Sequence, residues 1–322
     1  MFGITVQNET PIYTGNIPRP TLRAGEILIE TCYAGVNRAD LWQVAGKYPP
    51  PAGASDILGL EVSGIVAELS EGVTQFSIGD KVCALLEGGG YAHYARVAAS
   101  QTFHIPNGWN LREAGALPEA LFTVWLALFH TAKVQAGQTV LIHGGASGIS
   151  SMASQMVKAA GAIAITTAST PDKCRFSESC GAVKSYSYKQ DNFVEAILAD
   201  YQGVDAVLDI VGGDYFQKNL KLLKPYGRMV NLSFLESAKA DLNMAHLLFK
   251  QLSWHGLTLR GRTTEQKAQL AAEIKENCWS WLENKQVIPA IDDEFLLQNV
   301  EKAHKKMQQN LNLGKILLKT GT

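Results

Sequence analysis

The sequence lacks the charge and hydrophobicity patterns of several protein classes. It has no long run of acidic or basic residues, and 29 lysines and arginines stand against 30 aspartates and glutamates, for a formal net charge of −1. This balance argues against a nucleic-acid groove and against a polybasic membrane contact. The longest apolar run covers only residues 120–129, whereas a membrane-spanning helix needs about 20 apolar residues. We therefore expect neither nucleic acid nor a membrane as a partner.

Cysteine is also scarce. The chain of 322 residues has 5 cysteines, an odd number, with no Cys-x-x-Cys pair. This usage indicates a reducing compartment rather than a disulfide framework. Residues 1–10 have neither the basic region nor the apolar region of a secretory signal. We expect a soluble, cytoplasmic protein.

The pattern of predicted secondary structure changes near residue 118. The length suits about two domains. Residues 1–118 hold short alternating or β-branched runs broken by Gly, Pro and Asp, which is typical of strands. Residues 119–263 alternate apolar strands with amphipathic segments of helix length, which predicts a parallel sheet covered by helices. Residues 264–322 begin with a long helical stretch and end in a last strand, which we expect to complete the N-terminal domain.

Three segments of the second region give sharper expectations. Residues 171–181 form a helix with Thr170 as N-cap, Pro at its first position and Gly181 at its C-terminal cap. Residues 214–227 also have the length and pattern of a helix. Residues 253–262 are rich in β-favouring and apolar residues and contain neither Pro nor acid, which predicts the last strand of the sheet.

A cluster of small residues separates the strand 139–143 from the helix after it. On the pattern G-x-G-x-x-G, Gly145, Ser147 and Ser150 take the three glycine positions, and Gly148 adds another glycine. Residues without bulky side chains let the backbone approach a pyrophosphate, and the first N–H groups of the helix point at the anion. The alternative is a tight turn with close helix–strand packing. The position between a strand and a helix favours a dinucleotide site.

The end of the second strand indicates which dinucleotide binds. An NAD site usually has Asp or Glu about 20 residues past the glycines, where it binds the ribose 2′-hydroxyl. Residues 162–171 contain no acid, and Ser169, Thr170 and Lys173 cluster at the turn. Hydroxyls and an ammonium suit a 2′-phosphate, which a carboxylate would repel. Asp172 is a complication, but in the first helical turn it can favour the helix dipole and point away. The sequence therefore favours NADPH.

Several long motifs together resemble a known family. They are GVNRADLWQVAGKYPPPAGASDILGLEVSGIV at 35–66, IGDKVCALLEGGGYAHY at 78–94, ALPEALFTVW at 116–125, VLIHGGASGI at 140–149 and AHKKMQQNLNLGKILLK at 303–319. They resemble the zinc-free quinone oxidoreductases, the zeta-crystallin-like branch of the medium-chain dehydrogenase/reductase superfamily. Within it they are most similar to the sub-branch typified by the stress-induced NADPH quinone oxidoreductase. The resemblance covers essentially the whole chain. Ser150 departs from it, because the family usually has glycine there.

The resemblance implies a fold class and a domain plan. The fold is α/β, with a Rossmann-type doubly wound parallel sheet and a GroES-like, mostly β catalytic domain. The GroES-like domain would be residues 1–118, completed by 264–322, and the dinucleotide-binding domain would be residues 119–263.

The resemblance also bears on zinc. Zinc-dependent relatives have a cysteine where Asn37 stands and a histidine where Leu60 stands, and they carry a four-cysteine lobe that is absent here. Because a zinc site needs three or four convergent N, O or S ligands, we expect no metal. His130 and His143 are then most simply packed, hydrogen-bonded residues.

The resemblance further assigns the candidate site residues. It implies Asn37 near the nicotinamide, Tyr48 in the acceptor pocket as a proton or hydrogen-bond donor, and Ser147 at the nicotinamide end, and these three are the catalytic candidates. The alternative for Tyr48 is a half-exposed loop aromatic, and for Tyr188 a strand-end aromatic. The cofactor-binding candidates are Asn37, Thr123, Gly145, Ala146, Ser147, Gly148, Ile149, Ser169, Lys173, Tyr188, Phe234, Leu235 and Lys315.

Two classes of function remain open on the sequence. The first is an NADPH-dependent oxidoreductase that transfers hydride to a quinone, or to the double bond of an enone or enal, since such acceptors are electron-poor enough to react without a metal. The second is a nucleotide-binding protein with a structural or regulatory role and little turnover. The placement of Asn37, Tyr48 and the glycine-rich loop favours the enzyme, with a small quinone or enone as its substrate.

The last predicted strand also suggests an oligomer. An edge strand exposes unpaired N–H and C=O groups that must be covered or paired. Two-fold pairing of residues 253–262 with the same strand of a second chain would join two sheets into one. The resemblance points the same way, since members of that family commonly dimerise along this edge. The alternative is a monomer whose edge is guarded by Arg260 and Arg262, and we expect a homodimer.

Overall fold

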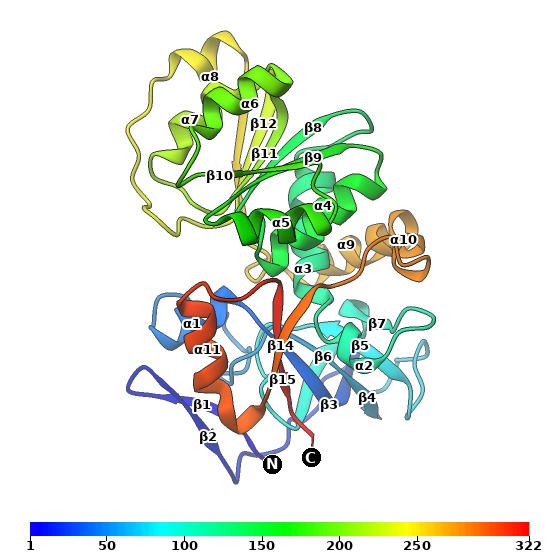
Figure 1. Ribbon diagram of the computed structural model, residues 1–322. Helices are drawn as coiled ribbons and strands as arrows, with labels where there is room; N and C mark the ends of the chain where they lie inside the picture. Colours follow the sequence, from blue (N-terminus) through cyan, green and yellow to red (C-terminus); the bar gives the residue numbers. More distant parts are fainter. Residues whose placement is uncertain (322) are drawn as a thin grey trace. The chain divides into compact units, whose positions relative to one another are not determined.

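The computed structural model describes residues 1–321, which divide into two compact units (Figure 1). Unit 1 comprises Met1–Phe122, Arg260–Glu283 and Ile291–Thr322, and unit 2 comprises Thr123–Leu259 and Asn284–Ala290. The chain passes from unit 1 to unit 2 after Phe122 and returns to unit 1 at Arg260. The short Asn284–Ala290 segment joins unit 2 because the Gln155 side chain bonds to both the N–H and the C=O of Ile288.

Unit 2 is built on a six-stranded sheet whose strands all run parallel, in the order β10-β9-β8-β11-β12-β13. In chain order this is 3-2-1-4-5-6, the doubly wound arrangement in which the strand order reverses between β8 and β11. Its elements are η2 (Trp125–Thr131), β8 (Thr139–His143), α4 (Gly148–Ala159), β9 (Ile163–Ala168), α5 (Pro171–Ser179), β10 (Lys184–Ser187), α6 (Phe193–Tyr201), β11 (Val204–Asp209), α7 (Tyr215–Leu222), β12 (Leu223–Asn231), α8 (Ala245–Phe249) and β13 (Ser253–Gly256).

Alternation along the strands explains how helices cover both faces of this sheet. Leu141, Ile165 and Val207 belong to one buried cluster with residues of α6 and α7. Their strand neighbours point the opposite way because side chains alternate between faces, and Thr166 contacts Ser177 on α5. Figure 1 shows α4 and α5 as one helix pair and α6 and α7 as another. The predicted parallel sheet covered by helices is confirmed.

Unit 1 holds a seven-stranded sheet of order β14-β15-β3-β4-β5-β7, with β6 paired to β3, and a separate β1-β2 hairpin. All pairs are antiparallel except β14 with β15. Its elements are β1 (Gly3–Gln7), β2 (Thr10–Thr14), β3 (Glu26–Val36), α1 (Arg38–Val44), β4 (Glu61–Leu69), β5 (Lys81–Leu85), β6 (Tyr94–Ala98), η1 (Ala99–Gln101), β7 (Thr102–His104), α2 (Leu111–Ala114), α3 (Pro118–Val124, which runs into unit 2), α9 (Thr264–Asn277), α10 (Trp279–Glu283), β14 (Ile291–Leu296), η3 (Leu297–Asn299), α11 (Val300–Gln308) and β15 (Lys315–Lys319).

The final strand completes the N-terminal sheet, as the sequence predicted, because β15 pairs with β3. Of two other expectations about this part of the chain, one was wrong, and the strand expected over residues 253–262 is the last of its sheet but shorter than predicted. The stretch after residue 263 is not continuously helical, since β14 pairs with β15 ahead of α11. The last strand of unit 2 ends at Gly256, and Leu259 to Arg262 form a turn that leads into α9.

The helix expected over residues 214–227 is also shorter than predicted. It ends at Leu222, and β12 begins at the next residue. The register between β11 and β12 shifts within Leu223–Arg228, where Tyr226 has a φ of +63°. Pro225 and Gly227 are poor helix formers, so the local sequence itself disfavours a helix beyond Leu222. Thr170, by contrast, caps α5 as predicted, with Pro171 in the first turn and Gly181 at φ +100° just past the end.

Candidate functional site

The glycine-rich loop follows β8, at the point where the strand order reverses. Gly144 has a φ of +69° and a Cβ there would lie 2.7 Å from the Ile210 side chain. At Gly145 a Cβ would lie 2.8 Å from Thr166 Oγ1 and 2.5 Å from Ser177 Oγ. The backbone can therefore lie close against β9 and α5 only without these side chains. This is the geometry that brings backbone N–H groups within reach of a pyrophosphate.

Ser147 and Ser150 use their hydroxyls inside this loop. Ser147 is the N-cap of α4, and its Oγ accepts from the Ser150 N–H at 3.1 Å. The Ser147 hydroxyl donates to Ser150 Oγ at 2.9 Å, and the Ser150 hydroxyl donates to the carbonyl of His143 at 2.9 Å. Ser150 is fully buried. The serine that replaces the family's glycine thus links the end of β8 to the start of α4.

A buried hydrogen-bonded chain runs beneath the loop. His143 contacts Thr167 Oγ1 at 2.8 Å and Asn219 Oδ1 at 2.7 Å, and Asn219 donates to Asp209 at 3.2 Å. Since Asn219 donates from Nδ2, its oxygen accepts from His143 Nε2–H, and His143 Nδ1 accepts from the Thr167 hydroxyl. Burial lowers the pKa of His143, so the imidazole is neutral. His143 is therefore a hydrogen-bonded packing residue, as expected.

Asp209 extends this chain toward the outer strands. Its Oδ1 accepts from the N–H groups of Val211 and Gly212, which orders the turn after β11. Its Oδ2 accepts from Asn231 at 3.0 Å, and Asn231 in turn accepts from the Trp254 indole on β13 at 2.8 Å. Sequence reasoning did not single out Asp209, since one acid at a strand end carries no signal of a network.

The candidates for the 2′-phosphate lie at the carboxyl ends of β9 and β10. Ser169 follows β9, Tyr188 follows β10 with its N–H bonded to Ala168, and Lys173 lies in the first turn of α5. Asp172, in the first turn of α5, forms an ion pair with Arg175. That pairing reduces the repulsion that a phosphate would meet there.

The remaining cofactor candidates of unit 2 lie near the turn after β11 and at the start of the unit. Phe234 and Leu235 are about half exposed, and the Leu235 N–H bonds to the carbonyl of Ile210. Thr123 is buried in α3. Ala146, Gly148 and Ile149 complete the glycine-rich loop and the start of α4.

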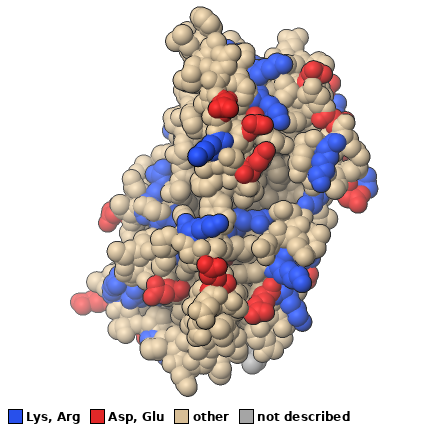
Figure 2. Space-filling model, turned by 90° about the vertical axis from the view of Figure 1, so that its left-hand side faces the viewer, with Lys and Arg blue, Asp and Glu red and all other residues tan. Residues whose placement is uncertain are grey.

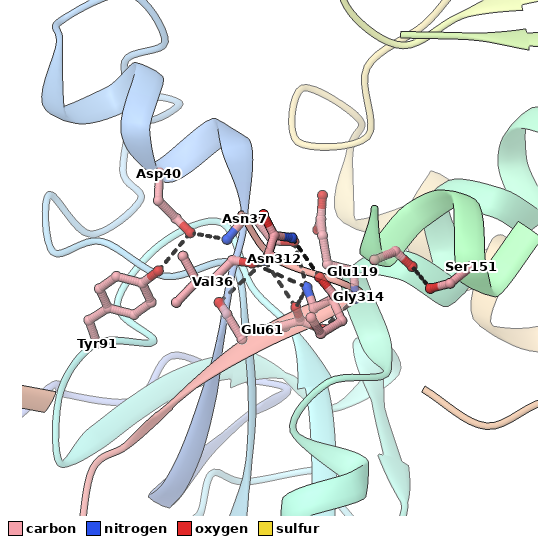
Figure 3. A network of polar contacts seen from close by, with 12 residues as sticks. Val36, Asn37, Asp40, Glu61, Tyr91, Glu119, Ser151, Asn312 and Gly314 are labelled. Carbon is pink, nitrogen blue, oxygen red and sulfur yellow. Dashed lines mark hydrogen bonds and ion pairs between the residues drawn. The ribbon is translucent and has the colours of Figure 1, made fainter. Parts of the chain in front are cut away.

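In unit 1, two candidates far apart in the sequence meet in a buried cluster. The Lys315 ammonium donates to Asn37 Oδ1 at 2.7 Å and forms an ion pair with Glu61. Asn37 Nδ2 also donates to Glu61 Oε1 at 2.9 Å. Lys315 is 3% exposed and Glu61 is 0% exposed. Because removing one partner of a buried ion pair leaves an uncompensated charge, the three side chains hold one another in place. Asn37, Glu61 and their neighbours are drawn in Figure 3.

Two further carboxyl groups belong to this region. Asp40 accepts from the Asn37 N–H at 2.7 Å and from the Tyr91 hydroxyl at 2.8 Å (Figure 3). Burial raises the pKa of Asp40 to about 6, although both hydrogen bonds lower it. Burial, followed by the repulsion of Glu61, raises the pKa of Glu119 to about 8. Glu119 is therefore largely protonated at neutral pH, which limits the negative charge around Lys315.

The residues present do not fit a zinc ion at the position used by zinc-dependent relatives. Asn37 offers an amide, Leu60 is a buried apolar side chain, and the Lys315 ammonium already occupies the side of Asn37 that faces Glu61. Within residues 1–321, no group of three or more His, Cys, Asp or Glu side chains could hold a metal ion.

Tyr48 follows α1, at the opposite end from Asn37. Arg260, in the turn before α9, places its guanidinium 5.4 Å from the centre of the Tyr48 ring and donates to the Tyr48 carbonyl at 3.2 Å. Arg260 is 6% exposed. From the sequence we predicted for Arg260 only that its charge could keep a second chain from pairing with the edge strand. Nothing local connects this arginine with a residue 212 positions earlier.

The charged side chains on the surface do not indicate a binding partner. On the face drawn in Figure 2, basic and acidic side chains are interspersed. That face does not present a field of one sign to steer a polyanion. No helix within the described 1–321 range is long and apolar enough to cross a membrane.

Two protein families match separate parts of the chain. "Alcohol dehydrogenase GroES-like domain" matches residues 23–107, and "Zinc-binding dehydrogenase" matches residues 148–276. The first match lies in unit 1 and confirms the expected GroES-like sheet domain. The second covers most of the parallel sheet and reaches into α9.

Full-length relatives match as well. The chain is 31% identical over 307 residues to quinone oxidoreductase-like protein 2 of Bos taurus, across 94% of this chain and 86% of that protein. It is 29% identical over 317 residues to the synaptic vesicle membrane protein VAT-1 homolog of Danio rerio, across 94% of this chain and 66% of that protein. The chain thus spans about two thirds of the latter's length.

Solved structures agree on the fold. The structure of Escherichia coli quinone oxidoreductase complexed with NADPH aligns with a TM-score of 0.88 and 24% identity, across 99% of this chain and 100% of that chain. At this identity the similarity shows the fold alone, and it confirms the α/β class with a doubly wound parallel sheet and a separate sheet domain.

Proposed function

This chain belongs to the zinc-free quinone oxidoreductase family of the medium-chain dehydrogenase/reductase superfamily, and on that basis we propose that it is an NADPH-dependent quinone reductase. It is an oxidoreductase of that superfamily and binds a nicotinamide cofactor. The identity of the acceptor, the choice of NADPH over NADH and the independence from zinc are the proposal.

The observation that carries the proposal is the Asn37–Glu61–Lys315 cluster. Lys315 donates to Asn37 and pairs with Glu61, so the residue that replaces the zinc-ligand cysteine is bound to a cation of the protein itself. Without a Lewis acid, the acceptor must be electron-poor itself, as a quinone is. The name of the Bos taurus relative, quinone oxidoreductase-like protein 2, supports the same acceptor class.

A bound NADPH would supply the hydride, and the chain's residues would position it. The residues without bulky side chains from Gly145 to Gly148 and the N–H groups at the start of α4 would bind the pyrophosphate. Ser169, Lys173 and Tyr188 would bind the 2′-phosphate, a choice supported by the pairing of Asp172 with Arg175. Thr123, Phe234 and Leu235 would contact the nicotinamide half.

The remaining residues would handle the acceptor. Hydride transfer to a quinone leaves negative charge on an oxygen, which must be protonated to give the hydroquinone. Tyr48 would donate a hydrogen bond or a proton to that oxygen, and Asn37 would hold the nicotinamide side of the pocket. Ser147 would assist if its hydroxyl turned from Ser150 toward the cofactor, since it donates to Ser150 in this structure.

Steady-state turnover tests the function directly. Purified protein, with its zinc content measured by elemental analysis, is assayed with 1,2-naphthoquinone, then with a panel of enones and enals, using NADPH and NADH separately. We expect quinone reduction with NADPH and no loss on chelation. Reduction of enals alone would assign the double-bond reductase. Cofactor binding without turnover would assign a structural or regulatory role, and activity lost on removal of stoichiometric zinc would reject metal independence.

Assembly and compartment complete the proposal. We propose a homodimer through β13, the edge strand of the parallel sheet, because its four residues are all exposed. Nearby apolar side chains are exposed too, among them Trp254 at 49% and Phe249 at 81%.

All five cysteines, which lie within the described residues, are free thiols, and this supports a reducing compartment such as the cytoplasm.

A further inference from the structure

Arg260 joins three separate parts of unit 1. Its Nε and Nη2 both donate to the carbonyl of Glu87, at 2.9 and 2.8 Å. Nη2 also donates to Gln43 Oε1 on α1 at 2.8 Å, and Nη1 donates to the carbonyl of Tyr48 at 3.2 Å. The flat guanidinium, with donors in fixed directions, can satisfy all three acceptors at once, which a lysine cannot do.

These acceptors are all neutral, so the charge of Arg260 is not cancelled by direct contact. The one carboxylate on the neighbouring loop, Glu87, pairs instead with Lys267 on α9 at 2.6 Å. Lys267 is fully buried and also donates to the carbonyl of Arg260 at 3.1 Å. Arg260 is thus held in place by its own backbone and by its side chain.

The Tyr48 ring lies against this cation. The guanidinium carbon is 5.4 Å from the ring centre, within the distance at which a cation is attracted to an aromatic face, about 6 Å. The same arginine binds the Tyr48 carbonyl. Both the ring and the backbone of Tyr48 are therefore fixed relative to one buried charge.

We infer that Arg260 is a positioning residue for Tyr48, which orients the phenol and electrostatically favours loss of its proton to the acceptor. This inference rests on the proposed function, in which Tyr48 is the donor. In that step the phenol O–H bond breaks, its proton joins the quinone oxygen that gained charge from the hydride, and Tyr48 regains a proton from solvent. A positive charge near the phenolate stabilises the anion left behind.

Other charged groups act on the same cluster. Burial lowers the pKa of the Arg260 guanidinium, and ionised Tyr48, Asp40, Glu119 and Glu87 partly offset this by favouring its charged form. Lys267 adds a second cation on the α9 side. Protonation of Glu119 or Asp40 would leave the positive charge of Arg260 less screened, whereas both carboxyl groups are ionised in the alkaline range where a phenol titrates.

The decisive measurement follows ionisation of Tyr48 without requiring activity. Protein labelled with 3-fluorotyrosine is titrated by ¹⁹F NMR, and the Tyr48 resonance is assigned by its loss in Tyr48→Phe. We expect Arg260→Met to raise the ionisation midpoint of Tyr48 by about one pH unit. Arg112→Met, which removes a partly exposed arginine paired with Glu294, is the matched control and should leave the midpoint unchanged.

Kinetics supply the second readout. Arg260→Met should lower kcat for the quinone at least tenfold and leave the Kd for NADPH within twofold, and its effect should largely vanish in a Tyr48→Phe background. Arg260→Lys keeps the positive charge but loses the planar set of hydrogen-bond donors. Relative to Arg260→Met, it should restore the ionisation midpoint of Tyr48 more fully than it restores kcat. If Arg260→Met does not fold, Arg260→Lys and Arg260→Gln are compared in its place, and only the glutamine variant should shift the midpoint.

The possible outcomes distinguish failure of the Arg260 inference from failure of the proposed quinone reductase function. An unchanged Tyr48 midpoint in a folded variant without the Arg260 charge overturns the inference, even if quinones are reduced. Equal kinetic losses from Arg260→Met in the wild-type and Tyr48→Phe backgrounds also overturn it. A wild-type protein that reduces no quinone rejects the proposed function, whereas the NMR titration still decides whether Arg260 acts on Tyr48.

Discussion

At the scale of single residues, the nucleotide-binding half of the chain depends on where a few hydroxyls and charges are directed. Asp172 lies beside the expected 2′-phosphate position, yet its carboxylate is paired with Arg175. Ser150 replaces the usual glycine, yet its hydroxyl satisfies a backbone carbonyl and the hydroxyl of the helix cap. Both residues look unfavourable in the sequence, and contacts one turn away explain why they are tolerated.

Lys173 offers the simplest residue-scale prediction. Replacing Lys173 with Ala removes the ammonium expected to bind the 2′-phosphate, and hydrogen bonds to charged groups contribute about 1.5–3 kcal/mol. We expect the KM for NADPH to rise roughly 10-fold to 100-fold and the KM for NADH to stay nearly constant. Lys221→Ala, on α7, serves as the control for loss of a lysine. Equal changes for both cofactors would reject the 2′-phosphate assignment.

Ser150 gives a second prediction, read out as stability. In Ser150→Gly the carbonyl of His143 loses its buried donor, and glycine disfavours the first turn of α4. Each effect costs about 1 kcal/mol, so the free energy of unfolding should fall by about 2 kcal/mol in urea titration. Ser150→Ala removes the hydrogen bonds but keeps the helical preference, and it should lose about half as much. A glycine variant as stable as the wild type would show that the Ser150 hydrogen bonds contribute nothing.

At the scale of elements, the start of α3 brings a carboxyl group beside the buried ion pair of β4 and β15. The Glu119 N–H donates to Glu61 Oε2 at 3.0 Å. The helix N-terminus thus binds the Glu61 carboxylate, while the Glu119 side chain is left with a pKa of about 8.

This raised pKa predicts how stability changes with pH. The folded chain holds the Glu119 proton up to about pH 8, whereas an unfolded glutamate loses it near pH 4.3. The stabilisation by this proton is complete below the unfolded pKa and is lost as pH rises through about 8. We expect the Tm to fall between pH 6 and pH 9, and Glu119→Gln to flatten that slope. Parallel slopes in the two proteins would contradict the assignment, and Glu113→Gln on α2 is the matched control.

At the scale of the whole molecule, the parallel sheet of unit 2 ends in an exposed edge. β13 carries Trp254, which packs edge-on against Phe216 with the ring centres 4.3 Å apart, and the exposed Leu248 and Phe249 lie on neighbouring α8. Exposed apolar side chains beside an open edge are typical of a protein–protein contact.

The backbone hydrogen bonds of β13 decide where a proline should break the proposed dimer. The Leu257 N–H already bonds to the Asn231 carbonyl on β12, and Leu259 lies beyond the strand, so neither offers a donor to a second chain. By alternation, the Gly256 N–H points away from β12. Wild type should sediment near twice the chain mass of 34.9 kDa, and Gly256→Pro should shift it toward monomer with little change in Tm.

Leu257→Pro provides the contrasting control for the dimer test, because it breaks a hydrogen bond within the chain. This variant should lose stability before it loses the dimer. A wild-type protein that stays monomeric at micromolar concentration would reject the dimer outright.

Features that depend on neighbours along the chain could be predicted from the sequence alone. The alternation of strands and helices, the cap at Thr170 and the small residues after β8 all express local backbone preferences, and periodicity shows them without a structure. The long family motifs added the GroES-like domain and the absence of the usual zinc ligands.

Contacts between distant groups became visible only in the folded chain. Lys315 bonds to Asn37 across 278 positions, and Arg260 binds the carbonyl of Tyr48 across 212. Nothing local marks such pairs, because burial and charge compensation arise only when the sheet brings the segments together.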